Sequence, residues 1–234
     1  TEIHFLMSIN ILHIDDPSYN DNRNYNYSSS EIVERAEYNL ISELVEYNSK
    51  IIDLGCGNGS LISKLIKEKN VSAKGIELSP SGVTACKQKG LNVFEGRIDE
   101  KLPFADNEFD YAICNVTIQM VMFPEILLSE MKRIAKYQIV SFPNFGFYKN
   151  RFDLFFKGRM PKPTLFGYTW YNTGHIHQLS LKDFEELVNN IGGLKIKQIK
   201  MLNLKNIFKS FFIRLFPNLF QIIIIILLEK EISE

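Results

Sequence analysis

The most constraining feature of the sequence is the stretch IIDLGCGNGS at residues 51–60. An apolar run ends in Asp53, and glycine then occupies every second position three times, at Gly55, Gly57 and Gly59. Glycines let the backbone turn sharply and let a ligand approach the main chain closely. The helix predicted to follow would present unpaired N–H groups at its first turn. The pattern therefore predicts a strand, a tight turn and a helix, with a ligand at the carboxyl end of the strand.

The rest of the chain alternates between two kinds of secondary structure. Short apolar or β-branched runs indicate strands, and amphipathic stretches indicate helices. We expect strands at residues 50–54, 72–78, 91–96, 108–114, 137–142, 194–202 and 220–230, and helices at residues 31–47, 61–69, 79–89, 124–135 and 181–191. Such alternation implies parallel βαβ units in a doubly wound sheet. No clear helix separates the last two strands, so we expect these two to pair antiparallel.

Charge and cysteine usage exclude several function classes. Lysine plus arginine and aspartate plus glutamate each number 27, so the net charge is zero and nothing global favours a nucleic-acid partner. The three cysteines, Cys56, Cys86 and Cys114, lie far apart and lack the spacing of a zinc site. Their odd number does not indicate a disulfide framework either. We therefore expect no metal site and a reducing, cytoplasmic setting.

Length and hydropathy indicate the domain organisation. The 234 residues suit one α/β domain. The apolar run at residues 222–228 is far shorter than the roughly 20 residues of a membrane-spanning helix, and its β-branched composition predicts a buried strand instead. The N-terminus shows no basic region followed by an apolar run, so no signal peptide is expected.

The glycine spacing distinguishes between nucleotide ligands. A dinucleotide fingerprint has the spacing GxGxxG, whereas here the third glycine comes one residue early and Asp53 stands two residues before the first. That arrangement is typical of enzymes that bind S-adenosylmethionine (SAM). Glu77 ends the second predicted strand, where a carboxylate can accept both ribose hydroxyls. A tight turn without a ligand would explain the glycines alone, but the glycines together with Glu77 favour a SAM site.

Several longer segments carry a resemblance to a known family. They are DLGCGNGSL, LNVFEGRIDEKL, NVTIQMV, SFPNFGFYKNRFDLFFKGRMP and WYNTGHIHQLSLKDFEEL. On these segments the chain resembles the class I SAM-dependent methyltransferases over about residues 30–230, and more narrowly the MetW family of methionine-biosynthesis proteins. The glycine motif is shared by a very large superfamily, whereas SFPNF, GRMP and WYNTGHIH in that order are much more specific.

The resemblance implies an α/β, Rossmann-like fold: a seven-stranded, mostly parallel sheet with an antiparallel last strand and helices on both faces. It makes residues 30–234 one methyltransferase-like domain, within which residues 142–178 form a lid or substrate insertion. Residues 1–29 form an N-terminal extension outside the usual family pattern. Tyr25 and Tyr27 in this extension are candidates to fold over the cofactor, although a tail packed away from the site is the simpler interpretation.

The resemblance also implies which residues contact SAM. Asp53 and the glycine loop would face the amino and carboxylate groups of the methionine moiety, and Glu77 would face the ribose. Ile98 and Asp99 would lie at the adenine, and Asn115 beside the methionine end. The cofactor-binding residues expected on this basis are Asp53, Gly55, Cys56, Gly57, Asn58, Gly59, Glu77, Leu78, Ile98, Asp99 and Asn115.

One residue departs from the family pattern in this region. The family often has an acid directly after the glycine of the loop that follows the third strand, and this chain has Arg97 there. Either Asp99 takes the contact to the adenine amino group in its place, or that contact is lost.

Residues 142–178 are dense in aromatic side chains with basic residues between them. Tyr148, Phe152, Phe155 and Phe156 recur at helical spacing and predict an amphipathic helix. Aromatic and basic residues together can also bind nucleic acid, but we expect this face to be buried as a lid over the sheet. An exposed part of the face would instead suggest a partner surface.

Methyl transfer from a sulfonium needs mainly an in-line nucleophile and the exclusion of water. A base is required only if the acceptor must first lose a proton, and His175 and His177 are the candidates. We expect their side chains to point opposite ways, so that at most one faces the pocket. The alternative is that both hydrogen-bond the backbone of the lid or of the following helix cap. Asn144 and Tyr171 are weaker candidates for substrate contacts, and as lid-packing residues they would need no further explanation.

Two functions emerge from the sequence. The first is a SAM-dependent methyltransferase acting on a small molecule, with S-adenosylhomocysteine as a product. The second, implied by the resemblance, is a SAM-binding partner of homoserine O-acyltransferase in methionine biosynthesis, a pathway of which SAM is a downstream product. A nucleic-acid methyltransferase is disfavoured, because the net charge is zero and SFPN lacks the Asp/Asn-Pro-Pro-Tyr/Phe pattern of enzymes that methylate base amines.

Overall fold

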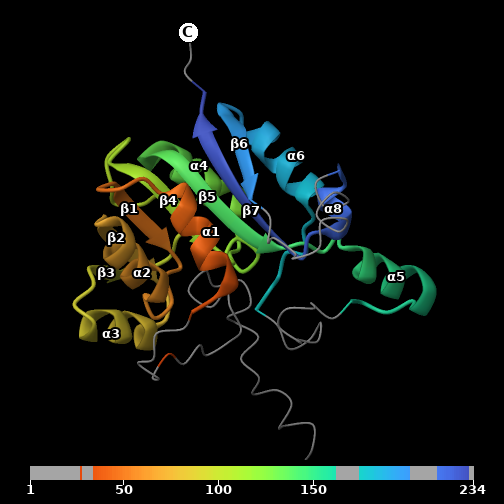
Figure 1. Cartoon of the computed structure of the whole chain (residues 1–234), viewed down its shortest axis with the longest axis horizontal. Helices are drawn as coiled ribbons and strands as arrows, with labels where there is room; N and C mark the ends of the chain where they lie inside the picture. Colours follow the sequence, from red (N-terminus) through yellow and green to blue (C-terminus); the bar gives the residue numbers. More distant parts are fainter. Residues whose placement is uncertain (1–26, 28–33, 162–173, 201–214, 232–234) are drawn as a thin grey trace, which may run out of the picture.

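A computed structural model describes residues 27, 34–161, 174–200 and 215–231. At its centre lies a seven-stranded sheet (Figure 1). The strands are β1 (Lys50–Leu54), β2 (Ser72–Glu77), β3 (Val93–Glu95), β4 (Phe109–Asn115), β5 (Ala135–Pro143), β6 (Leu194–Lys200) and β7 (Ile223–Lys230). Their order across the sheet is β3-β2-β1-β4-β5-β7-β6. Neighbours from β3 to β5 pair in parallel, whereas β7 pairs antiparallel with both β5 and β6.

Helices cover both faces of this sheet (Figure 1). The described helices are α1 (Ala36–Leu44), α2 (Ser60–Lys69), α3 (Pro80–Gln88), α4 (Pro124–Ile134), α5 (Tyr148–Lys157), α6 (Leu181–Ile191) and α8 (Pro217–Phe220). On one face α1 and α2 bury side chains such as Ile41 and Leu65. On the other face α4 and α6 bury side chains such as Leu128 and Phe184. The predicted Rossmann-like α/β fold with an antiparallel last strand is confirmed.

The apolar run near the end of the sequence forms β7, as predicted. Ile224 and Ile226 pack into the core that α4 and α6 cover, while Ile223 and Ile225 pack into the core on the other face. Because both faces of β7 pack into a core, its sequence needs no alternation with polar residues. Within the described ranges, no helix combines the length and the apolarity needed to cross a membrane.

Helix ends differ in how well their local signals predict them. The predicted capping box of α6 is present, with the Ser180 N–H donating to Asp183 Oδ2 at 2.7 Å. The helix expected over residues 31–47 is too long at its end, because α1 stops before Val45. Val45 adopts an extended conformation and is 1% exposed, so its burial in the core overrides the helical spacing of its neighbours.

α5 forms where a helix was predicted, but its aromatic face is not buried. The helix projects beyond the sheet (Figure 1), and Phe152, Phe155 and Phe156 are 51%, 81% and 68% exposed. The prediction of a buried lid is therefore wrong for α5, and residues 162–173 of the same segment lie outside the described residues. Helical periodicity shows which side chains share a face, but it does not show whether anything covers that face.

Candidate functional site

The glycine loop follows β1 and turns the chain into α2, as predicted. Gly55, Gly57 and Gly59 have φ angles of 82°, 57° and 74°, a region that residues with a Cβ rarely adopt. The Gly55 N–H donates to the Ile76 carbonyl at 2.8 Å, which anchors the loop to the end of β2. The backbone of the loop thus requires glycine, and the loop lies against the neighbouring strand.

The segment after β4 packs directly on the glycine loop. A Cβ on Gly55 would lie 2.6 Å from Thr117 Cγ2, so this close approach also requires glycine. The residue before Thr117 is Val116, whose φ of 55° is rare for a β-branched side chain. The Val116 N–H donates to the Ser141 carbonyl at 2.9 Å, which ties this unusual backbone to β5. Backbone strain held in place by a neighbouring strand is often found at binding sites.

Glu77 ends β2 beside the glycine loop. Its Oε2 accepts from the Gly57 N–H at 2.7 Å, and its Oε1 accepts from the Ser79 N–H at 2.9 Å. These bonds fix the orientation of the carboxylate, and a carboxylate oxygen can accept more than one hydrogen bond. The residue is 7% exposed, so most of its side chain is enclosed by the loop and by α3 at the strand end.

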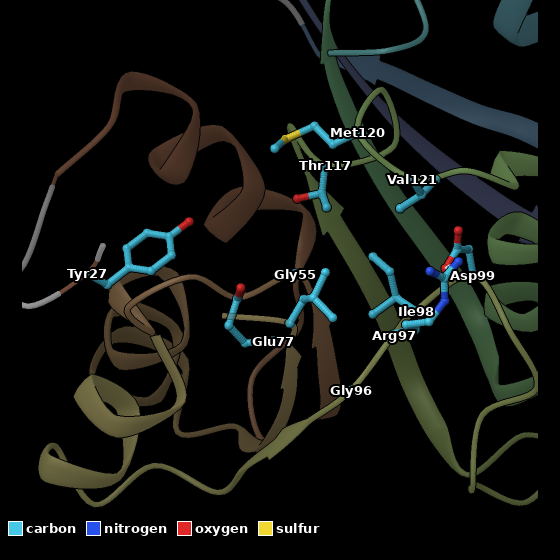
Figure 2. Close-up of a pocket in the computed structure, with 11 residues that line it drawn as sticks. Tyr27, Gly55, Glu77, Gly96, Arg97, Ile98, Asp99, Thr117, Met120 and Val121 are labelled. Carbon is cyan, nitrogen blue, oxygen red and sulfur yellow. The ribbon is translucent and has the colours of Figure 1, made fainter. Parts of the chain in front are cut away.

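The glycine loop, the segment after β4 and Glu77 border a pocket of about 550 Å³ including its open mouth (Figure 2). The lining residues are Tyr27, Gly55, Glu77, Leu78, Gly96, Arg97, Ile98, Asp99, Thr117, Met120 and Val121. The pocket lies at the carboxyl ends of β1 to β4, where the strand order reverses between β1 and β4. This reversal point is where open α/β sheets bind their ligands.

Asp53 is a buried acid in β1, one residue before the strand's end. It is 2% exposed, and its Oδ1 finds no hydrogen-bond partner among the described residues. Burial, and after it the negative charge of Glu77, raises the pKa of Asp53 to about 7. A buried carboxylate is costly when no cation compensates it, which is why burial favours the protonated form of Asp53.

Asp99 is engaged by the protein itself at the other end of the pocket. Its Oδ1 lies 2.6 Å from Arg97 Nη2 in an ion pair. Its Oδ2 accepts from the N–H groups of Met122 and Phe123 at 2.9 Å and 3.1 Å. Asp99 therefore anchors the segment that brings Val121 to the pocket, and it lines the pocket itself. Both alternatives for the adenine amino contact stay predictions.

The predicted cofactor residues divide into two groups. Those that line the pocket are Gly55, Glu77, Leu78, Ile98 and Asp99. Those that do not line it are Asp53, Cys56, Gly57, Asn58, Gly59 and Asn115. Cys56 packs in a small apolar cluster with Cys86, and Asn115 Oδ1 accepts from Ser141 Oγ at 2.5 Å. The second group thus shapes the loops and strand ends around the pocket.

The two histidines predicted as candidate bases do not line the pocket. The backbone N–H groups of Ile176 and His177 donate to the Gln119 carbonyl at 2.9 Å and 3.0 Å, which fastens their segment to the segment after β4. His175 is 8% exposed, Ile176 is 44% exposed and His177 is partly buried. This alternation contradicts the prediction that the two histidines point opposite ways, because residues two apart in an extended segment share a side.

Asn144, predicted as a weak candidate for substrate contact, has structural partners instead. Its Nδ2 donates to the carbonyls of Asn218 and Gln221 at 3.0 Å and 2.9 Å, and its Oδ1 accepts from the Gly146 N–H at 2.9 Å. These bonds join the end of β5 to the segment that leads into β7. Tyr171, the other candidate, lies outside the described residues.

Some lining residues were not among the predicted site residues, namely Gly96, Arg97, Thr117, Met120 and Val121. Their position shortly after β3 or β4 was a signal for them, because ligands bind at the carboxyl ends of such strands. Tyr27, named only as one of two candidates in the N-terminal extension, also lines the pocket. Tyr25, the second candidate, lies outside the described residues.

Known structures share this architecture. A SAM-dependent methyltransferase from Thermotoga maritima matches with a TM-score of 0.57 and 19% identity, over 84% of this chain and 88% of that chain. One from Mesorhizobium loti matches with a TM-score of 0.59 and 14% identity, over 86% of this chain and 100% of that chain. The seven-stranded sheet and the pocket at its carboxyl edge thus define a protein with the class I SAM-dependent methyltransferase fold.

Within that class, a sequence model of the methionine biosynthesis protein MetW matches residues 35–228, and the chain belongs to the MetW family. A bifunctional methionine biosynthesis protein MetXA/MetW from Rhodopirellula baltica is 31% identical over 172 residues, which cover 69% of this chain and 28% of that protein. A malonyl-[acyl-carrier protein] O-methyltransferase from Buchnera aphidicola is 26% identical over 114 residues, covering 47% of this chain and 46% of that enzyme. The chain thus spans less than half the length of either relative.

Proposed function

We propose that this protein is a SAM-dependent methyltransferase that acts on a small molecule. The observation that carries the proposal is the pocket at the carboxyl edge of the sheet, which Glu77 and Gly55 of the positive-φ glycine loop line. The Buchnera relative is named as an O-methyltransferase, which supports the same reaction class.

The residues present suit each part of SAM. Glu77 would accept the ribose hydroxyls, as expected of an acid at the end of the second strand. Asp53 would compensate the positive amino group, because its own carboxyl is buried without a hydrogen-bond partner on Oδ1 in the described structure. Leu78, Ile98 and Val121 supply apolar walls of the kind that a flat adenine ring packs against.

Bound SAM would supply a methyl carbon already activated by the sulfonium. The task of the protein is then to hold the acceptor in line with that carbon and to keep water out. Thr117 and Met120 line the pocket beside Gly55 and would border the acceptor there. A base is needed only for an acceptor that must lose a proton, and His175 and His177 remain candidates for that step only.

Calorimetric titration with SAM and S-adenosylhomocysteine tests this function. We expect micromolar binding to the unmodified protein and a roughly 10- to 100-fold loss in Glu77→Gln, because hydrogen bonds to a charged acceptor are lost. Glu95→Gln is the matched control, since Glu95 pairs in register with Glu77 on β3 and is exposed. Absence of binding to the unmodified protein would rule out the methyltransferase, whereas binding would justify a screen of methyl acceptors.

A second candidate function is that of a partner protein for homoserine O-acyltransferase. Two observations favour it. The relative from Rhodopirellula baltica carries MetXA and MetW in one bifunctional protein. In this chain, α5 exposes Phe152, Phe155 and Phe156 together, and exposed apolar groups of this kind often mark a protein interface.

Mixing the protein with the homoserine O-acyltransferase of the same organism tests the second candidate. The measurements are complex formation by size-exclusion chromatography and the rate of acyl transfer. We expect the double variant Phe155→Ser/Phe156→Ser to lose both effects, and the control Phe94→Ser to keep them, because Phe94 is 46% exposed but lies on β3, in another part of the surface. Failure of the unmodified protein to bind the acyltransferase would remove this candidate.

A further inference from the structure

We propose that Tyr27 is a positioning residue that shields Glu77 from water and so makes the site selective for ligands with both ribose hydroxyls. The inference rests on the proposed SAM site. It goes beyond that proposal by giving a role in ligand selection to a residue of the N-terminal extension, which lies outside the part of the chain that the family model matches.

Tyr27 is attached to the pocket through its backbone as well as its ring. Its N–H donates to Ser81 Oγ at 3.0 Å, within the first turn of α3. The ring lies on the same side of the pocket as Glu77, with the hydroxyl turned towards the other lining residues (Figure 2). A residue far from β1 in sequence thus forms one wall of the site.

Two glycines make room for the Tyr27 ring. A Cβ on Gly57 would lie 3.3 Å from Tyr27 Cε1, and a Cβ on Gly82 would lie 3.1 Å from Tyr27 Cδ2. Gly82 lies inside α3 without a positive φ, where alanine would favour the helix more than glycine does. Packing is therefore the reason for glycine at this position.

Gly82 also lies close to both Tyr27 and Glu77. The same added Cβ would lie 2.8 Å from Glu77 Cγ and 2.9 Å from the Gly57 carbonyl oxygen. The ring of Tyr27, the stem of Glu77 and the glycine loop therefore surround one small volume. Removing the ring would open this corner of the pocket to water.

The exposure of Glu77 to water determines how strongly the site selects its ligand. In a dry site, a ligand that lacks one hydroxyl leaves the carboxylate short of a hydrogen bond, and this loss is costly. In a wet site, a water molecule replaces the missing hydroxyl and the loss is small. Removing Tyr27 should therefore change the ratio between the affinity for a ligand with both ribose hydroxyls and the affinity for one that lacks a hydroxyl. Removing a purely structural residue would lower both affinities by the same factor.

Titration with S-adenosylhomocysteine and its 2′-deoxy analogue tests this role. We expect the unmodified protein to favour the ribose compound by roughly 100-fold, and Tyr27→Ala to reduce that ratio to about 10-fold or less. Tyr27→Phe should keep the ratio, because the ring provides the shielding. Tyr47→Ala is the matched control, since Tyr47 is 68% exposed and does not line the pocket.

The possible results separate this inference from the function on which it rests. Loss of all binding by the unmodified protein would overturn both. An unchanged ratio in Tyr27→Ala, even with weaker binding of both compounds, would overturn the inference alone. Circular dichroism would confirm that each variant folds, and if Tyr27→Ala does not, Tyr27→Leu provides the same test with a smaller change of volume.

Discussion

Asp53 makes the stability of the fold depend on pH. Burial raises its pKa from 3.8 to about 7, so the native state holds this proton more tightly than the unfolded state does between these values. The free energy of unfolding should therefore fall as the pH rises from about 4 to about 7, by up to about 4 kcal/mol from this residue. Asp53→Asn should lack this contribution.

Urea unfolding of the unmodified protein and of Asp53→Asn across that pH range measures the difference. The stability of Asp53→Asn relative to the unmodified protein should be greater at pH 8 than at pH 4. The substitution removes the cost of a buried charge only at a pH where Asp53 would be ionised. Glu100→Gln, at an exposed position, serves as the control. Parallel pH profiles for Asp53→Asn and the unmodified protein would contradict the raised pKa.

Gly55 provides a test of close packing between the two loops of the site. Gly55 and Gly90 have similar φ angles, 82° and 72°, so alanine is strained at both. An added Cβ meets Thr117 at 2.6 Å in the first case and nothing within 4 Å in the second. Gly55→Ala should therefore cost about 1–3 kcal/mol more than Gly90→Ala in urea unfolding. Equal losses would show that the contact with Thr117 contributes nothing.

Single residues also show how far a sequence can predict a site. Gly55 and Glu77 could be placed at the pocket because each lies at the end of a predicted strand, and the sequence alone shows where those strands end. Thr117 and Tyr27 come to the pocket from distant parts of the chain, and their approach depends on packing that no local pattern records. For the same reason Asn144, a polar residue in a suitable segment, proved to hold the backbone of its neighbours.

Helices and strands were easier to predict than the site, because the hydrophobic periodicity and composition of a short segment indicate its own secondary structure. β1 was predicted with its observed bounds, and β7 was recognised from a β-branched run although it shows no alternation. α5 illustrates the limit. Its aromatic residues share one face as predicted, but the sequence could not show that this face lies beyond the edge of the sheet. Whether other parts of the protein pack against an amphipathic face depends on tertiary structure.

α5 yields a prediction at the same scale. Phe155→Ser/Phe156→Ser should change the free energy of unfolding by no more than about 0.5 kcal/mol, because both side chains are largely exposed. Phe142→Ala, at a fully buried position in β5, should cost about 3–5 kcal/mol in the same urea titration. A comparable loss in the α5 variant would mean that its face is covered in solution.

At the scale of the whole molecule, β7 joins the edge strand β6 to the rest of the sheet. β6 reaches the other strands only through β7, which is itself paired with β5. Ile224→Ala, at a fully buried position in β7, should cost about 2–5 kcal/mol and should weaken amide protection in β5 and β6 together. Ile66→Ala, at a position 40% exposed, is the control. Faster exchange confined to β6 would show that β5 does not depend on this pairing.

The place of β7 also affects how the protein is made. About 80 residues separate the end of β5 from the start of β7, and a ribosome takes about 4–16 s to add them. During that interval the parallel strands that carry the pocket can assemble, while β5 presents an open edge to the cell. An unpaired edge of this kind can bind other strands or chaperones, so we expect slower translation through this stretch to lower the yield of folded protein.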